Sequence, residues 1–154
     1  MELTETFLTA MAEANPGDFA FYLFAENRLI LLQHSPCLAA AAGRTEEEYA
    51  ALTAGDALNA VPDSERLRLL ALLRGLRQTG QDADFSHRIL HKTLGQIPVQ
   101  AKIRRIGTLR GAPVLAASFV WPGPEAQEYA RLLDCISSTV YVIDRASYEL
   151  LYVN

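Results

Sequence analysis

The side chains best suited to chemistry in this sequence are three histidines and two cysteines, His34, His87, His91, Cys37 and Cys135. A histidine can bind a metal or move a proton near neutral pH, and a cysteine thiolate is a nucleophile. The cysteines form no C-x-x-C motif, and the histidines do not have metal-ligand spacing. The sequence also contains no glycine-rich phosphate loop and no serine or cysteine beside a base. We therefore predict no catalytic residue and no metal site, and expect both cysteines to be reduced, buried and inert.

His87 has the most informative surroundings of the three histidines. Phe85, His87 and Ile89 alternate onto one face of a predicted strand. The imidazole is then either a polar group inside a pocket, able to bind a ligand or respond to pH near neutrality, or a hydrogen-bonded histidine of the core or of a strand edge. We favour the second interpretation and keep the first open.

The charged residues exclude one class of partner. The formal net charge is −4 and the pI is near 5.3, whereas nucleic-acid-binding domains present clustered Lys and Arg. The one basic cluster, Lys102, Arg104 and Arg105, lies in a predicted strand and is interpreted as a solvated sheet face. The acidic run at positions 46–48 points in different directions around a helix, so we interpret it as favourable helix-dipole charge and not as a cation site.

Hydrophobic residues are abundant but are not arranged for a membrane. Half of the 154 residues are hydrophobic, enough for a core without metals or disulfides. No stretch reaches the roughly 18 consecutive apolar residues of a transmembrane helix. The N-terminus, with Glu2 and Glu5, lacks the basic start of a signal peptide. We expect no membrane partner, no nucleic-acid partner and a cytoplasmic location.

The elements that position these residues begin with an amphipathic helix from Glu2 to Ala14. Its apolar positions recur at spacings of four, four and three, and the expected buried stripe is Leu3, Phe7, Met11 and Ala14. A hairpin follows, with strands at Phe19–Phe24 and Leu29–Leu32. The first strand is apolar at every position, so both of its faces should be covered, by the N-terminal helix or by a partner subunit.

Short helices are predicted between Pro36 and Gly55, where Thr45 and Glu48 have capping-box spacing. The longest helix is predicted from Asp63 to Gly80, and its expected core flank carries leucines at intervals of three: Leu67, Leu70, Leu73 and Leu76. Three antiparallel strands complete the pattern, at Asp84–Leu90, Ile97–Ile106 and Ala112–Trp121. Helices gathered between two groups of strands predict an α+β fold.

The last residues repeat the first hairpin. A narrow apolar stripe predicts a helix over Glu125–Ser137, and a second hairpin is predicted over Thr139–Asn154. Adding 119 to the numbers of Tyr22, Leu31 and Leu32 reaches Tyr141, Leu150 and Leu151 without a gap. We interpret the second hairpin as the opening of another copy of the domain, which implies a fragment of a longer chain.

The order of these segments resembles a PAS domain. The stretch "AAAGRTEEEYAAL" resembles the helical "lGyt-eEl" segment of that family, "AVPDSERLRLLALL" its "ihPdD" entry into the long helix, and "YVIDRASYELLYVN" its first hairpin. The resemblance implies a five-stranded antiparallel sheet with short helices and one long helix on one face, plus an N-terminal flanking helix. It divides the chain into a flanking helix at 1–16, a PAS domain at 17–121, a linker helix at 122–138 and the start of a second PAS domain at 139–154.

The resemblance also implies a pocket between sheet and short helices. We name His87, Phe85 and Ile103 as candidate pocket residues, and a small-molecule ligand as possible. Covalent flavin binding is not expected, because "GRTEEEYA" lacks the cysteine of the light-sensing motif. Haem is not expected either, because the histidines lie on strands or a turn and not on the long helix.

The function implied is a sensor or dimerisation module that regulates an output domain further along the chain. The terminal hairpin resembles repeats found upstream of GGDEF diguanylate cyclases, so that output is favoured, with a sensor histidine kinase or a transcriptional regulator as alternatives. A ligand-free structural interaction domain with a filled core is the competing hypothesis. We expect a homodimer through the N-terminal helix and the sheet face.

Overall fold

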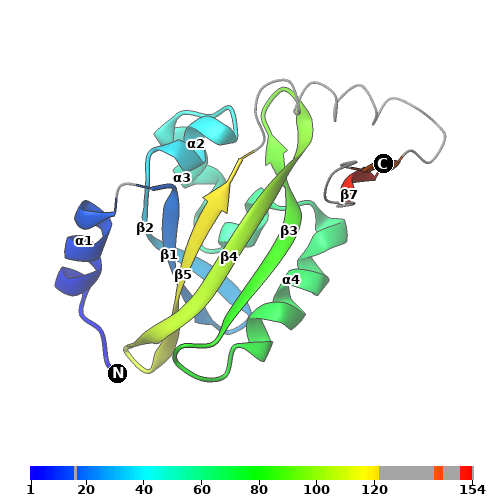
Figure 1. Cartoon of the computed structure of the whole chain (residues 1–154). Coiled ribbons are helices and arrows are strands. Elements are labelled where there is room, and N and C mark those ends of the chain that lie inside the picture. Colours follow the sequence, from blue (N-terminus) through cyan, green and yellow to red (C-terminus); the bar gives the residue numbers. More distant parts are fainter. Residues whose placement is uncertain (16, 122–140, 144–149, 154) are drawn as a thin grey trace.

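The computed structural model describes residues 1–15, 17–121, 141–143 and 150–153 (Figure 1). The helices are α1 (Glu5–Ala14), α2 (Cys37–Ala41), α3 (Glu46–Thr53), the 3₁₀ helix η1 (Ala57–Ala60) and α4 (Asp63–Gly75). The strands are β1 (Phe19–Ala25), β2 (Arg28–His34), β3 (Asp82–His91), β4 (Gly95–Leu109), β5 (Ala112–Val120), β6 (Tyr141–Ile143) and β7 (Leu150–Val153). Among the described helices, none combines the length and hydropathy needed to cross a membrane.

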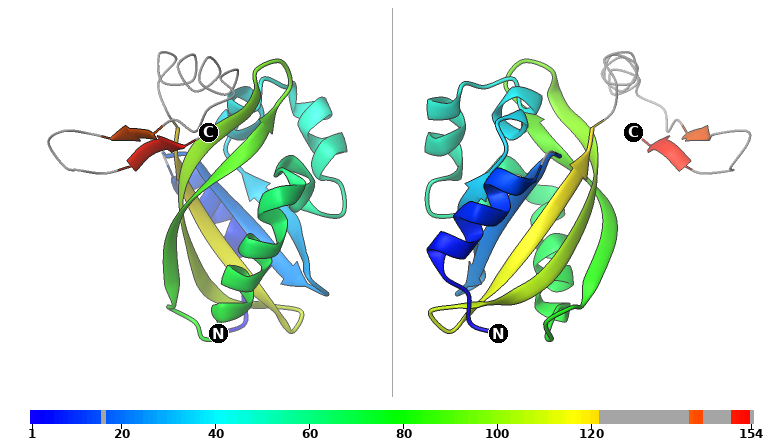
Figure 2. Two further views of the ribbon diagram at one scale, coloured as in Figure 1. Left: turned by 90° about the vertical axis from the view of Figure 1, so that its right-hand side faces the viewer. Right: turned by 60° about the vertical axis from the view of Figure 1, so that its left-hand side comes forward.

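Five strands form one antiparallel sheet in the order β2-β1-β5-β4-β3. Helices α2, α3, η1 and α4 lie on one face of this sheet, which we call the inner face, and α1 lies on the opposite, outer face (Figures 1 and 2). The predicted α+β architecture is confirmed. Two hairpins turn through only two residues with positive φ, at 26–27 and at 110–111, as tight hairpins of this twist require.

The two faces explain why β1 is apolar at successive positions. Ala20 and Tyr22 belong to the core between sheet and inner helices, while Phe19 and Phe21 belong to a second cluster beneath α1. Because side chains alternate across a strand, a strand buried on both faces cannot show polar alternation. The predicted cover by the N-terminal helix is confirmed.

The predicted stripe is confirmed for Leu3 and Met11, which pack in the cluster beneath α1, and is wrong for Phe7 and Ala14, which are exposed. Leu8 is the buried helical residue, whereas Phe7 is 47% exposed. The helix starts later than expected, because the Thr4 hydroxyl accepts a hydrogen bond from the Phe7 amide and caps it. Leu3 therefore precedes the helix and does not share its period.

Residues before α1 are attached to the β4–β5 hairpin. The Leu3 amide donates to the Thr108 carbonyl at 2.7 Å, and the Thr108 amide donates to the Met1 carbonyl at 2.9 Å. The Glu2 carboxylate accepts from the Thr108 hydroxyl at 2.6 Å and from a backbone amide of the turn. Gly107 permits this approach, since a Cβ there would lie 2.7 Å from the Met1 carbonyl oxygen. The N-terminal segment is thus part of the fold.

The long helix α4 begins at Asp63 as predicted but ends at Gly75, not near Gly80. Its core side carries Leu69 and Leu73, followed by Leu76 at the C-cap, while Leu67 is 80% exposed. Of the predicted leucines, Leu70, Leu73 and Leu76 do pack in the core. Leu67 falls outside it, because each step of three residues rotates about 60° around a helix of 3.6 residues per turn.

The charged clusters serve the fold. The Thr45 hydroxyl caps the Glu48 amide at 3.1 Å as predicted, but the Glu48 carboxylate pairs with Lys92 at 2.8 Å and does not complete the capping box. The Lys92 amide also donates to a carbonyl at the end of α2, so the β3–β4 hairpin lies against the short helices. Lys102 and Arg104 are exposed on the outer face as predicted.

Arg105 departs from the predicted solvated face. Its guanidinium donates to the carbonyls of Leu76 and Arg77 at the end of α4. Irregular pairing between β4 and β5 begins at this residue, where the register shifts between Arg105 and Gly107. The alternation of β4 explains the departure from the predicted face, because Arg105 follows Ala101 and Ile103 onto the inner face, whereas Lys102 and Arg104 point to the outer face.

The second hairpin is present, with a register that differs from the predicted repeat. Tyr141 pairs with Val153, and Leu150 pairs with Ile143. The offset of 119 would instead place Leu150 opposite Tyr141, as Leu31 lies opposite Tyr22. The predicted linker at 122–138, including its helix and Cys135, lies outside the described residues.

Candidate functional site

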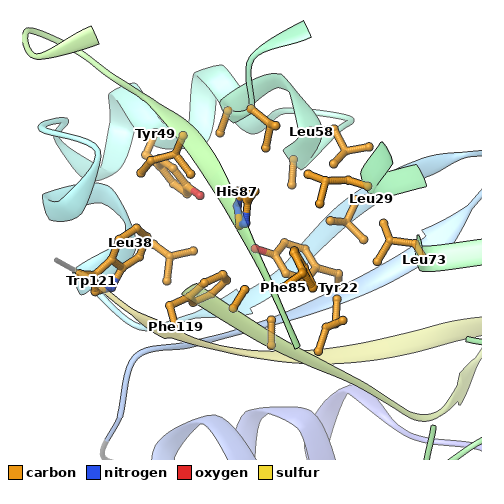
Figure 3. Close-up of a pocket in the computed structure, with 18 residues that line it drawn as sticks. Tyr22, Leu29, Leu38, Tyr49, Leu58, Leu73, Phe85, His87, Phe119 and Trp121 are labelled. Atoms are coloured by element: carbon orange, nitrogen blue, oxygen red, sulfur yellow. The ribbon is translucent and has the colours of Figure 1, made fainter. Parts of the chain in front are cut away.

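A cavity of about 60 Å³ lies between the inner face of the sheet and the short helices (Figure 3). Strand β3 places alternate residues toward it, and α3 and η1 cover it from the other side. The Asp56 carboxylate holds η1 in place by accepting from the Leu58 amide at 3.0 Å and from the Leu29 amide of β2 at 3.2 Å. These two hydrogen bonds tie the start of η1 to β2 and so position η1 over the cavity.

The three candidate residues named from the sequence all line this cavity. Phe85 and His87 come from β3, with ring centroids 5.4 Å apart, and Ile103 comes from β4. Ile89 lies on the same side, as the predicted alternation requires. The structure thus brings these candidate residues close together around one cavity. Their role in binding a ligand stays a prediction.

His87 is buried, with 8% of its surface exposed, and its Nδ1 has no hydrogen-bond partner within the described part of the chain. The favoured interpretation of a hydrogen-bonded core histidine is therefore wrong for this nitrogen. Desolvation, helped by the positive charge of Arg68, lowers the pKa of His87 to about 4. The response to pH near neutrality, which the other interpretation included, is not supported, because the ring is already neutral there.

Two tyrosines face the same cavity, and neither was singled out from the sequence. Tyr22 comes from β1 and Tyr49 from α3, and their hydroxyl oxygens lie toward the His87 ring (Figure 3). Burial raises the pKa of Tyr49 to about 12 and that of Tyr22 well above its usual value, so both are protonated at neutral pH. A tyrosine inside the otherwise apolar strand β1 was the available signal.

A second polar atom without a partner lies at the end of β5. Trp121 lines the cavity and stacks on Phe119 with ring centroids 5.5 Å apart. Its indole Nε1 is buried and has no hydrogen-bond partner among the described residues. The sequence identified Trp121 only as the end of a predicted strand, because the burial of one ring atom cannot be read from spacing.

The other histidines and Cys37 do not line the cavity. His34 lies 3.6 Å from the Glu46 carboxylate, and the ring of His91 packs against Gly43. Cys37 is exposed, which corrects the expectation that it is buried, and a hydrogen bond with Asp18 raises the pKa of its thiol. Within the described residues, no group of three acidic, histidine or cysteine side chains could hold a metal.

Neither flavin nor haem fits these residues. A space of about 60 Å³ is far below the roughly 300–1,000 Å³ of pockets for drug-sized ligands. Among the described residues, the lining includes no asparagine or glutamine to hydrogen-bond a flavin ring and no cysteine to form an adduct. His87 does reach the cavity, but a macrocycle in front of it would need the space that the walls occupy.

Comparisons with known proteins identify the fold. No family model matches the sequence, and no curated protein matches it. The structure is similar to the Rhodobacter sphaeroides LOV protein, at 11% identity with a TM-score of 0.61, covering 86% of this chain and 80% of that one. It is also similar to a PAS domain from Desulfitobacterium hafniense, at 20% identity, a TM-score of 0.53 and coverage of 73% and 99%.

A third similar structure is the sensory box histidine kinase/response regulator from Burkholderia thailandensis, at 12% identity with a TM-score of 0.50 and coverage of 82% and 92%. At these identities the comparisons establish architecture only. The strand order and the placement of the helices agree with them. The chain described here therefore has the PAS fold.

Proposed function

We propose that this chain is the sensory input module of a signalling protein, and that a small molecule in the inner cavity is its signal. The observation that carries this proposal is the buried Nδ1 of His87. This nitrogen belongs to a residue that lines the cavity, and it has no hydrogen-bond partner among the described residues. An unpaired buried polar atom costs about 1–3 kcal/mol. A bound ligand would offset that cost, whereas a filled structural core would have no reason to keep a histidine there.

The route of the signal is proposed to start at Trp121. This residue touches the cavity and immediately precedes positions 122–138, for which we propose the role of a linker helix. A ligand that contacts the indole could therefore act on the chain leading to the output domain. We keep a GGDEF diguanylate cyclase as the favoured output, with a histidine kinase or a transcriptional regulator as the alternatives, and the histidine kinase among the similar structures supports a sensory context.

Cavity-filling variants test the coupling in the full-length protein. Ala117 is 5% exposed and lines the cavity from β5, so Ala117→Leu would occupy ligand space. We expect this variant to change the output activity and to abolish its response to added ligand. Ser118→Leu, at an exposed position on the same strand, is the matched control and should leave the output unchanged.

Native mass spectrometry separates sensing from the ligand-free alternative. A small molecule retained by the purified chain, and lost from Ala117→Leu, would support a sensor. A bare mass from every preparation, together with unchanged output in Ala117→Leu, would favour a structural interaction domain.

A homodimer is also proposed, through α1 and the sheet face. The support is the apolar surface that α1 leaves open, which includes Phe7 at 47% and Met1 at 72% exposure. A concentration-dependent mass by light scattering would agree with this proposal, and a monomer at all concentrations would contradict it.

A further inference from the structure

Three of the polar side chains that line the cavity gather at one place, apart from the Trp121 indole. The hydroxyls of Tyr22 and Tyr49 and the ring of His87 converge from β1, α3 and β3 (Figure 3). We call these three side chains the polar centre. Burial raises the pKa of the Tyr22 hydroxyl, and the nearby Tyr49 raises it further, which agrees with the closeness of the two rings.

The polar centre can both donate and accept hydrogen bonds. Each hydroxyl has one donor and two acceptor sites, and a neutral imidazole has one donor and one acceptor nitrogen. The Nδ1 of His87 is without a partner among the described residues. A ligand oxygen placed between these side chains would accept hydrogen bonds from more than one of them. If that oxygen belongs to a hydroxyl group, it could also donate a hydrogen bond to one of them.

Charge at the cavity restricts the ligand further. None of the 18 residues that line it is aspartate, glutamate, lysine or arginine. An ionised group without a partner of opposite charge is strongly disfavoured in such surroundings. Carboxylates, phosphates and protonated amines are therefore excluded, and neutral molecules are favoured.

The volume of the cavity and the residues of its walls indicate the size and polarity of the rest of the ligand. A cavity holds one water molecule once its volume reaches about 10–15 Å³, so the space of about 60 Å³ suits a molecule of few heavy atoms. Away from the polar centre the walls are apolar, with Leu58 and Leu73 from the helices and Phe119 from the sheet. A ligand with an apolar body and a single polar group would match a cavity that has polar side chains at one place and apolar walls elsewhere.

We infer that the cavity binds a small neutral molecule with one hydroxyl or carbonyl oxygen, which hydrogen-bonds to Tyr22, Tyr49 and His87, and an apolar body that packs on the opposite wall. This inference names the ligand class for the proposed sensory function and rests on it.

Titration of the whole chain followed by NMR tests the inference. The sequence has a single tryptophan, so the indole N–H of Trp121 gives one resolved reporter at the cavity. The probes are 2-butanone and propionate, which have equal numbers of heavy atoms but differ in charge, and xenon, which is apolar. We expect a saturable shift with 2-butanone and at least tenfold weaker binding of propionate.

Two variants address the polar centre. His87→Phe and Tyr49→Phe each remove hydrogen-bonding atoms while keeping a ring, and each should weaken 2-butanone binding at least tenfold without weakening xenon binding. His91→Phe, the same change at a histidine whose ring lies against Gly43 outside the cavity, should bind like the wild type. Well-dispersed amide spectra confirm that each variant is folded.

The outcomes separate this inference from the proposed function. If xenon shifts Trp121 but 2-butanone binds equally well to wild type and to folded His87→Phe and Tyr49→Phe, the cavity admits ligands and the ligand class is wrong. Equal binding of propionate overturns the restriction to neutral molecules. If neither xenon nor 2-butanone produces a saturable shift, both the ligand class and the cavity as a sensing site fail.

Discussion

Replacing His87 with phenylalanine should make the domain more stable, and the gain should grow as the pH falls. The ring is buried on β3 among Phe85, Tyr22 and Tyr49, with Arg68 of α4 as the cation that influences it. At neutral pH the substitution removes the unpaired Nδ1, which we expect to stabilise the fold by about 1 kcal/mol.

The pH dependence follows from the two pKa values of His87. The pKa is about 4 in the folded protein, against about 6.5 in the unfolded chain. Between these values the unfolded state binds more protons, so wild-type stability falls as the pH is lowered through 6.5 and the loss is complete below 4. The loss amounts to about 2 kcal/mol at pH 5 and about 3 kcal/mol at pH 4.

Urea denaturation at pH 7 and pH 5, followed by circular dichroism, measures this difference. The stability of His87→Phe relative to wild type should rise from about 1 to about 3 kcal/mol between the two pH values. Leu73→Ala on α4 is the control, because it alters the same cavity away from the His87 ring and without a titratable group, and its effect should be the same at both pH values (Figure 3). An equal gain for His87→Phe at pH 7 and pH 5 would refute the picture of a buried neutral ring.

Three further predictions concern α1 and its attachment. Leu8→Ala should cost about 2–5 kcal/mol, whereas Phe7→Ala should change stability by no more than about 0.5 kcal/mol; equal losses in thermal unfolding would contradict the observed register of the helix. Gly107→Ala should destabilise by about 1–3 kcal/mol, because the new Cβ meets the N-terminal segment, while Gly75→Ala, in open space, should be neutral or stabilising; chemical denaturation compares the two. Deleting residues 1–14 should expose the outer face and shift the protein to monomer or aggregate, and light scattering that shows an unchanged dimer would refute this.

Much of the fold could be predicted because hydrophobic periodicity and turn residues are local signals. The hairpin of β1 and β2, the cap at Thr45 and the start of α4 at Asp63 all follow from residues within one or two turns of each other. The errors lie where packing chose among several apolar residues. Phe7 and Leu67 looked like core residues, but capping at Thr4 and the rotation of the helix placed others inward.

Only part of the candidate site could be predicted from the sequence. Alternation along β3 placed Phe85 and His87 together correctly, because the period of a strand is a local property. The hydroxyls of Tyr22 and Tyr49 join them only because β1 and α3 meet across the cavity. The spacing of residues in the sequence does not indicate that β1 and α3 come together there.

The sequence by itself determined the class of fold, the two-sided burial of β1 and the side of β3 that faces the core, since each depends on the order of neighbouring residues. Only the tertiary structure decided that His87 is neutral and unpaired and that an apolar cavity remains beside it. Both properties depend on how closely distant segments pack and on which polar atoms find partners. Those are features of the assembled core and not of any stretch of the chain.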